Sequence, residues 1–214
     1  MRGGRGMRVA RTACAAAAGA LVLAACTGSL LQTKRSRPVA YQLAVRGGAR
    51  GPAVAADVKV LTPLVHAGLD SDRIAAAYPD RRLDYFAGAR WSAPLDETLG
   101  ELAVEEFRAR SGLRNAVPDG SALQPRYWLE IEVVSFEARY GRDGGPPTVD
   151  AHFVARVGDS TGRRTLARID ARAEQSADAN RMGAIVAAFE AAADRALGQI
   201  VSGTDRALAA RAGR

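Results

Sequence analysis

Cysteine and histidine, which often serve as nucleophiles, general bases or metal ligands, are scarce in this chain. The 214 residues include two cysteines and two histidines, namely Cys14, Cys26, His66 and His152. His66 is expected in a loop and His152 on the polar face of a strand. Neither has a cysteine or carboxylate at a spacing typical of zinc ligands. The sequence therefore predicts no metal site and implies no cofactor.

Motifs for nucleophilic catalysis and phosphate binding are equally hard to find. No serine lies in a Gly-x-Ser-x-Gly elbow, and the glycine-rich stretch at 141–147 lacks the Lys-Ser/Thr ending of a phosphate loop. Glu130 and Glu132 stand two residues apart on the expected polar face of a strand, where solvated carboxylates are common. We therefore expect no catalytic residues and a protein that is not an enzyme. A hydrolase is the alternative, which loss of an activity on mutation of His66 or His152 would support.

Cys26 follows a segment with the charge order of a bacterial export signal. Residues 1–11 contain four arginines and no acid, and residues 12–25 are uncharged. This uncharged run is shorter than the about 20 apolar residues that a membrane-spanning helix needs. Residues 1–25 are therefore predicted to be a signal peptide that is removed, with translation starting at Met1 or at Met7.

The residues Leu23-Ala24-Ala25-Cys26 resemble the cleavage and lipidation box of bacterial lipoproteins. In that pattern the cysteine thiol is alkylated with diacylglycerol, and the cysteine becomes the new N-terminus. Cys26 is therefore the predicted lipidation site, with palmitate among the expected acyl chains. Ordinary cleavage at an Ala-x-Ala site is the alternative. Thr27 follows in place of the aspartate associated with inner-membrane retention, which favours the outer membrane.

Removal of the signal changes how the charge of the chain is interpreted. The whole sequence carries 30 basic and 23 acidic residues, and four of the basic residues lie in the signal. The mature part therefore has 26 basic against 23 acidic residues. Such a small excess gives little support for nucleic-acid binding. Cys14 is lost with the signal as well, so no disulfide can form within the mature chain.

Four segments follow from composition. After the signal at 1–25, the polar and basic stretch 26–38 is the expected lipidated N-terminus and flexible tether, which reaches roughly 40 Å when extended. Residues 39–201 are expected to form a single domain, which is long enough to bury its own core. Residues 202–214 are expected to fray.

Hydrophobic periodicity predicts the elements of that domain. Strands are expected at 41–45, 54–61, 74–78, 83–87, 127–139, 149–157 and 165–173, and helices at about 94–110 and 181–201. A break in the alternation after Val133 predicts a β-bulge, and Asp150, His152 and Arg156 are expected on a solvated face. Because helices and strands segregate, the expected class is α+β. A mainly antiparallel sheet should carry the two longer helices on one face.

The segment between Leu69 and Leu95 resembles a known family. Leu69-Asp70 with Ile74, then a hairpin ending in Arg90-Trp91 and the following Pro94-Leu95, is similar to the auxiliary lipoprotein component of ABC-type transport systems. That family includes the lipoprotein of the paraquat-inducible intermembrane transport system. The order of Tyr41-Gln42-Leu43, the 58–63 strand and the 127–136 strand extends the resemblance over most of the mature domain.

The resemblance implies a lipoprotein without catalytic activity that faces the periplasm, typically from the outer membrane. Its implied partners are a mammalian-cell-entry domain protein and the ABC permease and ATPase that move phospholipid or another hydrophobic compound across the envelope. Arg90, Trp91 and Pro94 would then either contact a partner or pack the junction between hairpin and helix. Binding of a lipid cargo and self-association are left open. The alternative function is a lipoprotein that scaffolds or activates cell-wall synthesis or secretion assemblies.

Overall fold

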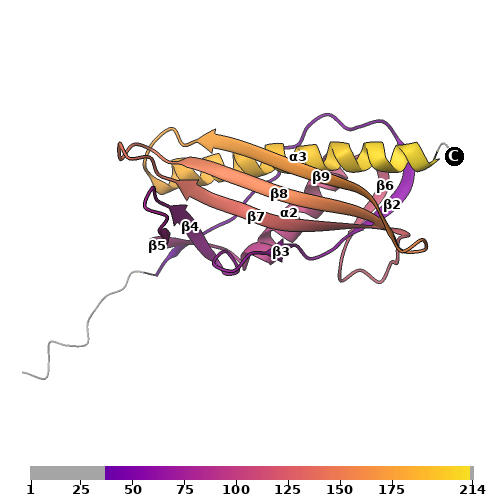
Figure 1. Cartoon of the computed structure of the whole chain (residues 1–214), viewed down its shortest axis with the longest axis horizontal. Coiled ribbons are helices and arrows are strands. Elements are labelled where there is room, and N and C mark those ends of the chain that lie inside the picture. The colour runs from indigo at the N-terminus through magenta and orange to yellow at the C-terminus, as the bar shows by residue number, and fades with distance from the viewer. Residues whose placement is uncertain (1–36, 213–214) are drawn as a thin grey trace, which may run out of the picture. The chain divides into compact units, whose positions relative to one another are not determined.

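The structure is a computed structural model that describes residues 37–212. The predicted signal peptide, the lipidation site at Cys26 and most of the tether lie outside these residues. From Pro38 onward the chain forms one compact unit (Figure 1). In chain order its elements are β1 (Val39–Tyr41), β2 (Val54–Val60), β3 (Leu64–Val65), β4 (Arg73–Ala77), β5 (Leu83–Trp91), α2 (Leu95–Arg110), β6 (Leu113–Pro118), β7 (Tyr127–Arg139), β8 (Thr148–Asp159), β9 (Arg164–Ser176) and α3 (Met182–Ala212).

The long strands β7, β8 and β9 form an antiparallel meander on one side of a mixed sheet, with β9 at its edge. Along the other edge of β7 lie β2, β3 and β4, which pair with it in succession and parallel to it. Parallel pairing arises here because residues 54–77 advance along β7 in its own direction. The outer strands complete the sheet, with β6 on β2, β5 antiparallel to β4, and β1 on β5.

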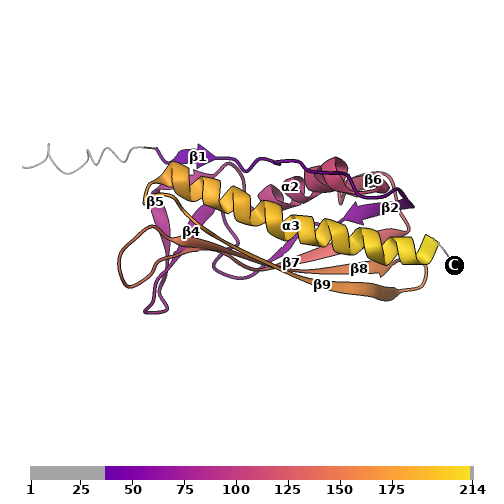
Figure 2. The same cartoon turned by 90° about the horizontal axis from the view of Figure 1, so that it is seen from above.

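Both helices cover the same face of the sheet (Figure 2). Helix α3 packs against β8 and β9, and α2 packs against β6 and against α3. The expected α+β class, with a mainly antiparallel sheet and two helices on one face, is therefore confirmed. Neither of these two helices is apolar over a stretch long enough to cross a membrane.

An aromatic cluster joins α3 to the sheet. The Phe189 ring of α3 lies 4.8 Å from the Phe136 ring of β7 and 5.2 Å from the Trp91 ring at the end of β5, edge to face in both pairs. Phe153 of β8 extends the cluster, with its ring centre 5.9 Å from that of Phe136. All four side chains are at most 1% exposed. Such pairs add to the large apolar area that aromatic rings bury, so this cluster is the centre of the core.

The expected bulge in β7 is confirmed. The pairing of β7 with β8 shifts by one residue between Val133 and Ser135. Leu129, Ile131 and Val133 face the helices before the shift, and Phe136 does so after it. The extra residue brings the second half of β7 back into phase with the core.

Three predictions about individual segments were wrong. Helix α3 does not fray at 202 but continues to Ala212, because Thr204, Asp205 and Leu208 are buried against the rest of the domain. In place of the strand expected at 41–45, only Val39–Tyr41 pairs with another strand. The alternating hydrophobic pattern after Tyr41 arises because Leu43 and Val45 pack on the core without strand partners.

The third error concerns Asp150, which was expected to be solvated but is 1% exposed. Its carboxylate is covered by Ser135, which donates a hydrogen bond to it, and by Arg139, whose Nη2 lies 2.6 Å from it. Because β8 is flanked on both sides by long strands, even its polar face is largely shielded from water.

Substitution of Phe189 tests the role of the aromatic cluster. Phe189→Ala should lower the free energy of unfolding by about 3–5 kcal/mol, because a cavity would remain between α3 and β7. Leu123→Ala is the matched control: Leu123 is 61% exposed, so its loss should change stability by less than about 0.5 kcal/mol. Urea unfolding followed by circular dichroism measures both. Equal midpoints for the two variants would contradict this assignment.

Candidate functional site

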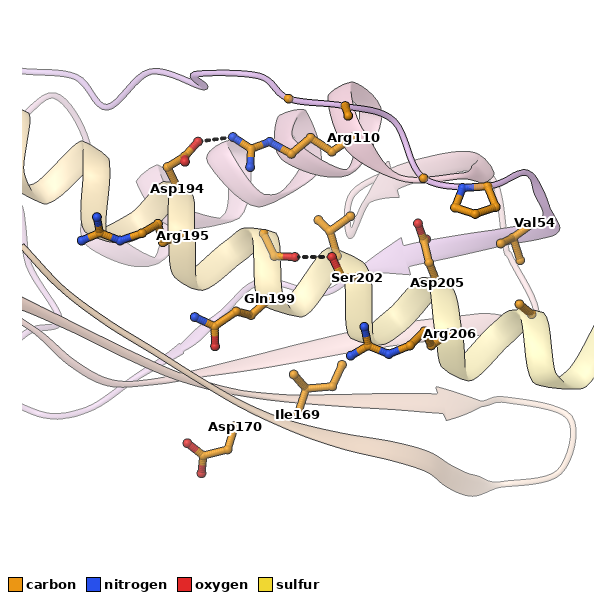
Figure 3. Close-up of a pocket in the computed structure, with 17 residues that line it drawn as sticks. Val54, Arg110, Ile169, Asp170, Asp194, Arg195, Gln199, Ser202, Asp205 and Arg206 are labelled. Carbon is orange, nitrogen blue, oxygen red and sulfur yellow. Dashed lines mark hydrogen bonds and ion pairs between the residues drawn. The ribbon is translucent and has the colours of Figure 1, made fainter.

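A groove of about 890 Å³ runs along α3, beside the loop that precedes β2. Its apolar wall includes Val54, Ile169 and Val201, and its charged lining includes Asp194 and Arg206 (Figure 3). An apolar wall with a few polar groups is typical of sites that bind small molecules or peptide segments. The groove is therefore the first candidate for a binding site.

Arg110 at the end of α2 fixes one side of this groove. Its Nη2 donates a hydrogen bond of 2.6 Å to the carbonyl oxygen of Gly47 in the loop and also pairs with Asp194 of α3. Its Nε lies 2.8 Å from a carboxylate oxygen of Glu106, one turn earlier in α2. One guanidinium thus connects both helices and the loop, which uses the planar, multiply donating geometry of arginine.

Asp205 of α3 makes a second connection to the same region. One of its carboxylate oxygens accepts a hydrogen bond of 2.5 Å from the Ser111 hydroxyl, and the other accepts one of 2.8 Å from the Gly112 amide. The loop approaches Gly112 so closely that a Cβ atom there would lie 1.7 Å from the Pro52 carbonyl oxygen. Glycine is therefore required at 112, and the loop wall is held tightly against the end of α2.

The Glu106 carboxyl group beneath this wall is 1% exposed. Burial raises its pKa from 4.5 to about 7, although the nearby Arg110 charge opposes this shift and Asp194 adds to it. Close to neutral pH, Glu106 therefore exists in both protonation states beneath the charged lining of the groove.

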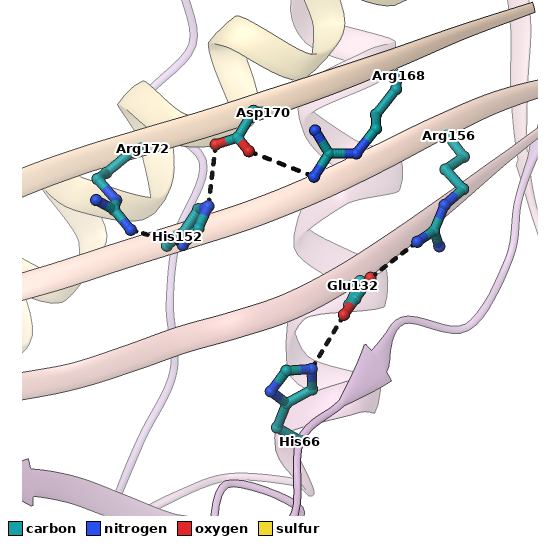
Figure 4. A network of polar contacts seen from close by, with 7 residues as sticks. All are labelled: His66, Glu132, His152, Arg156, Arg168, Asp170 and Arg172. Atoms are coloured by element: carbon teal, nitrogen blue, oxygen red, sulfur yellow. Dashed lines mark hydrogen bonds and ion pairs between the residues drawn. The ribbon is translucent and has the colours of Figure 1, made fainter.

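The opposite face of the sheet, away from the helices, carries a second polar feature (Figure 4). The Arg156 guanidinium lies between two carboxylates, with one nitrogen 2.7 Å from Glu130 and another 3.1 Å from Glu132. Glu132 also contacts Nε2 of His66 at 3.1 Å. The hydrogen bond to His66, together with Arg156, lowers the pKa of Glu132. The two glutamates expected on this face are thus ion-paired.

His152 lies in a neighbouring network on β8 and β9. Arg172 donates a hydrogen bond of 2.8 Å to Nδ1 of His152. The ring proton of His152 is therefore on Nε2, which donates it to Asp170 at 2.9 Å. Asp170 also pairs with Arg168 at 3.5 Å. Both ring nitrogens of His152 are therefore occupied by side chains. Within residues 37–212, no three His, Cys, Asp or Glu side chains are grouped as metal ligands would be.

The junction residues proposed from the sequence come together where β5 meets α2. Trp91 is 1% exposed and belongs to the aromatic cluster. Arg90 donates a hydrogen bond of 2.9 Å from Nη1 to Asp72. Pro94 is exposed and immediately precedes α2, and its carbonyl oxygen accepts a hydrogen bond of 2.9 Å from the Thr98 amide. These contacts favour the packing interpretation for Trp91. Partner contact by Arg90 and Pro94 stays a prediction.

The groove residues were not among the residues singled out from the sequence. Arg110 and Asp194 are separated by 84 residues, and Ser111 and Asp205 by 94. No local motif marks such pairs. The one available signal is Ser111-Gly112 at the end of a helix, which indicates a tight chain reversal but no binding role.

The buried Glu106 predicts how stability depends on pH. Its pKa is higher in the folded than in the unfolded state, so folding takes up a proton between about pH 4.5 and 7. The wild type should therefore gain on the order of 2 kcal/mol of stability from this group as pH falls from about 8 to 5. Glu106→Gln should remove this gain.

Urea unfolding at both pH values measures the effect. Glu101→Gln is the matched control, because its exposed side chain lies in the same helix, does not contribute to the pKa shift of Glu106 and should leave the dependence unchanged. Parallel pH profiles of the wild type and Glu106→Gln would contradict the buried-carboxylate interpretation.

Comparison with known proteins identifies the family. The family model for the ABC-type transport auxiliary lipoprotein component matches residues 41–201. The crystal structure of protein XCC0632 from Xanthomonas campestris matches with a TM-score of 0.75 at 22% identity, covering 82% of this chain and 99% of that one. The crystal structure of an uncharacterized protein matches with a TM-score of 0.61 at 17% identity, covering 78% and 97%. The comparison with curated proteins gave no match.

At these identities the two crystal structures show a shared fold, and the family model supplies the assignment. The matched region runs from Tyr41, the last residue of β1, through β9 and includes most of α3. The chain belongs to the family of ABC-type transport auxiliary lipoprotein components.

Proposed function

We propose that this protein is the lipid-anchored auxiliary component of a mammalian-cell-entry type ABC transporter, which moves phospholipid or another hydrophobic compound across the envelope. The observation that carries the proposal is the family match over residues 41–201, which begins fifteen residues after Cys26. An anchoring cysteine, a short tether and a domain of this family follow one another in the order that such a role requires. The domain then acts by binding partners and does no chemistry of its own.

The groove beside α3 suits a binding role. Its walls are held by Arg110 and Asp205, so the groove is formed before a partner arrives and little conformational entropy is lost on binding. The apolar residues Val54, Ile169 and Val201 can contact a hydrophobic segment. The charged side chains at its margin, including Arg206, would select the orientation of that segment.

The charged face of β7, β8 and β9 is a second surface suited to a protein partner. Its arginines pair with carboxylates both across neighbouring strands, as Arg156 does with Glu130, and along one strand, as Arg168 does with Asp170 in β9. Exposed pairs of this kind contribute little to stability but set the specificity and rate of association. Both histidines take part in these networks, which supports a non-catalytic role for them.

Anchoring is assigned to Cys26, with the domain on the periplasmic side of the outer membrane. Diacylglycerol at the thiol together with a further acyl chain on the amino group gives far more persistent membrane binding than one chain. The residues between Cys26 and Pro38 then let the domain move within roughly 40 Å of the bilayer surface.

Labelling with palmitate tests the anchor. Cys26→Ala should lose the label almost entirely and accumulate with its signal uncleaved, because the thiol that accepts diacylglycerol is gone. Cys14→Ala is the matched control, because this cysteine lies inside the signal and should leave labelling and membrane fractionation unchanged. A Cys26→Ala protein that is still processed and labelled would exclude this site.

Affinity purification from native membranes tests the transporter assignment. The wild type should recover a mammalian-cell-entry domain protein with its permease and ATPase. Recovery of cell-wall synthesis or secretion components alone would favour the scaffold alternative and contradict the proposal. Charge reversal at Arg168, which is exposed on the sheet face, should weaken the recovery if that face carries the contact, whereas reversal at Arg114 in β6 should not.

A further inference from the structure

The hairpin between β4 and β5 has an unusual turn. Tyr78 and Arg82 close it through a backbone hydrogen bond of 3.0 Å, and Arg81 adopts a left-handed conformation with φ of 66°. A non-glycine residue rarely adopts this conformation, and here it holds the Arg81 side chain at the exposed end of the hairpin. Within residues 37–212, Arg81 has no carboxylate within ion-pair distance.

Aromatic side chains from the residue after β7 and from β5 support this turn. The rings of Tyr78 and Tyr140 are stacked with centres 5.2 Å apart and planes 8° apart, and Phe86 packs against Tyr140 at 6.5 Å. The Arg82 guanidinium lies 4.4 Å from the centre of the Tyr78 ring. Two stacked tyrosines with arginines around them resemble the amphipathic side chains that occupy membrane interfaces.

Between the hairpin and the end of β7 lies a hollow of about 430 Å³, which we call the hairpin hollow. Tyr78 and Tyr140 line it together with Leu83, which is 40% exposed. Its charged lining consists of Arg81, Arg82, Arg139 and Glu137. Glu137 and the buried Asp150 are paired with Arg139, and Asp80 lies 3.9 Å from Arg82. Arg81 is therefore the cation that is available to an incoming anion.

The hairpin hollow lies at the end of the domain where the chain enters it. Figures 1 and 2 show β1, the β4–β5 hairpin and the β7–β8 connection at one end, and the C-terminus at the other. Val39 at the start of β1 is 56% exposed at this end. The chain from Cys26 joins the domain at this end, so this end can reach the membrane that holds the anchor.

We propose that the hairpin hollow binds the headgroups of the membrane that holds the anchor, with Arg81 at the lipid phosphate and Tyr78 and Tyr140 at the interface. The proposal rests on the anchoring assigned above. An arginine near an anionic surface and an exposed leucine among tyrosines are the groups that hold a protein at a bilayer interface. Contact at this end orients the domain, so that the groove beside α3 and the charged sheet face stay free for partners.

A fluorescent probe at two exposed leucines tests this orientation. The lipidated protein, purified from membranes, carries either Leu83→Cys or Leu123→Cys with an environment-sensitive dye; acylation blocks the Cys26 thiol. Leu123 precedes the start of β7, whereas the hairpin hollow adjoins its end, so the two probes report on opposite ends of the domain. In vesicles of phosphatidylethanolamine and phosphatidylglycerol with brominated acyl chains, the dye at 83 should be quenched at least about threefold more strongly than that at 123.

Two charge reversals separate the role of Arg81 from general electrostatics. Arg81→Glu, in the Leu83→Cys background, should bring the quenching down towards that of the 123 probe, while the acyl chains keep the protein on the vesicles. Arg163→Glu is the matched control, because Arg163 is also exposed and left-handed in a hairpin turn, with φ of 46°, but at the opposite end. It should leave the quenching unchanged.

The outcomes that overturn the proposal are distinct. Equal quenching at 83 and 123 on floated vesicles would exclude the orientation while leaving the anchor intact. A protein that does not float with the vesicles would exclude the anchor and the orientation that depends on it. Quenching at 83 that falls as the ratio of protein to lipid rises would assign the hairpin hollow to a second copy of the chain.

Discussion

The domain depends on the packing of α3 across the antiparallel meander of β7, β8 and β9. Phe189 makes this contact, because it meets Phe136 from the sheet and Trp91 from the end of β5 in one buried cluster. The sheet alone would expose the apolar side of three long strands, and α3 alone would expose its apolar stripe. Each covers the other. The position of α2 follows, because α2 starts at Leu95, shortly after the buried Trp91.

Once α3 is fixed, polar contacts along it position the remaining chain. Arg110 and Asp205 hold the end of α2 and the loop before β2 against it, in an arrangement that requires glycine at 112. These groups are partly or fully buried and almost all are paired. Their main effect is to select one conformation of the loop, and their net contribution to the stability of the fold is small. The groove beside α3 is a consequence of that fixed loop. The binding surface and the core are therefore built on the same helix.

The three surfaces of the domain differ in chemistry, and this separation suits an anchored binding protein. The groove is partly apolar, the open sheet face is covered by ion pairs such as Arg156 with Glu130, and the hairpin hollow combines tyrosines with Arg81. The β4–β5 hairpin that lines the hollow lies where the chain enters the domain, at the other end from the C-terminus (Figure 1). With that end at the membrane, the other two surfaces are accessible at the same time.

The sequence by itself determined the α+β class, the bounds of β7 and α2, the bulge after Val133 and the family, because alternation and helical periodicity are local consequences of burying one face. Only the tertiary structure decided the rest. Strands β3 and β6 lack a clear pattern and exist because β7 and β2 offer them a pairing edge. Asp150 is buried because its strand is central, and α3 continues to Ala212 because Asp205 meets Ser111 across 94 residues. Contacts between distant residues depend on how the elements pack together, and no local spacing in the chain encodes that packing.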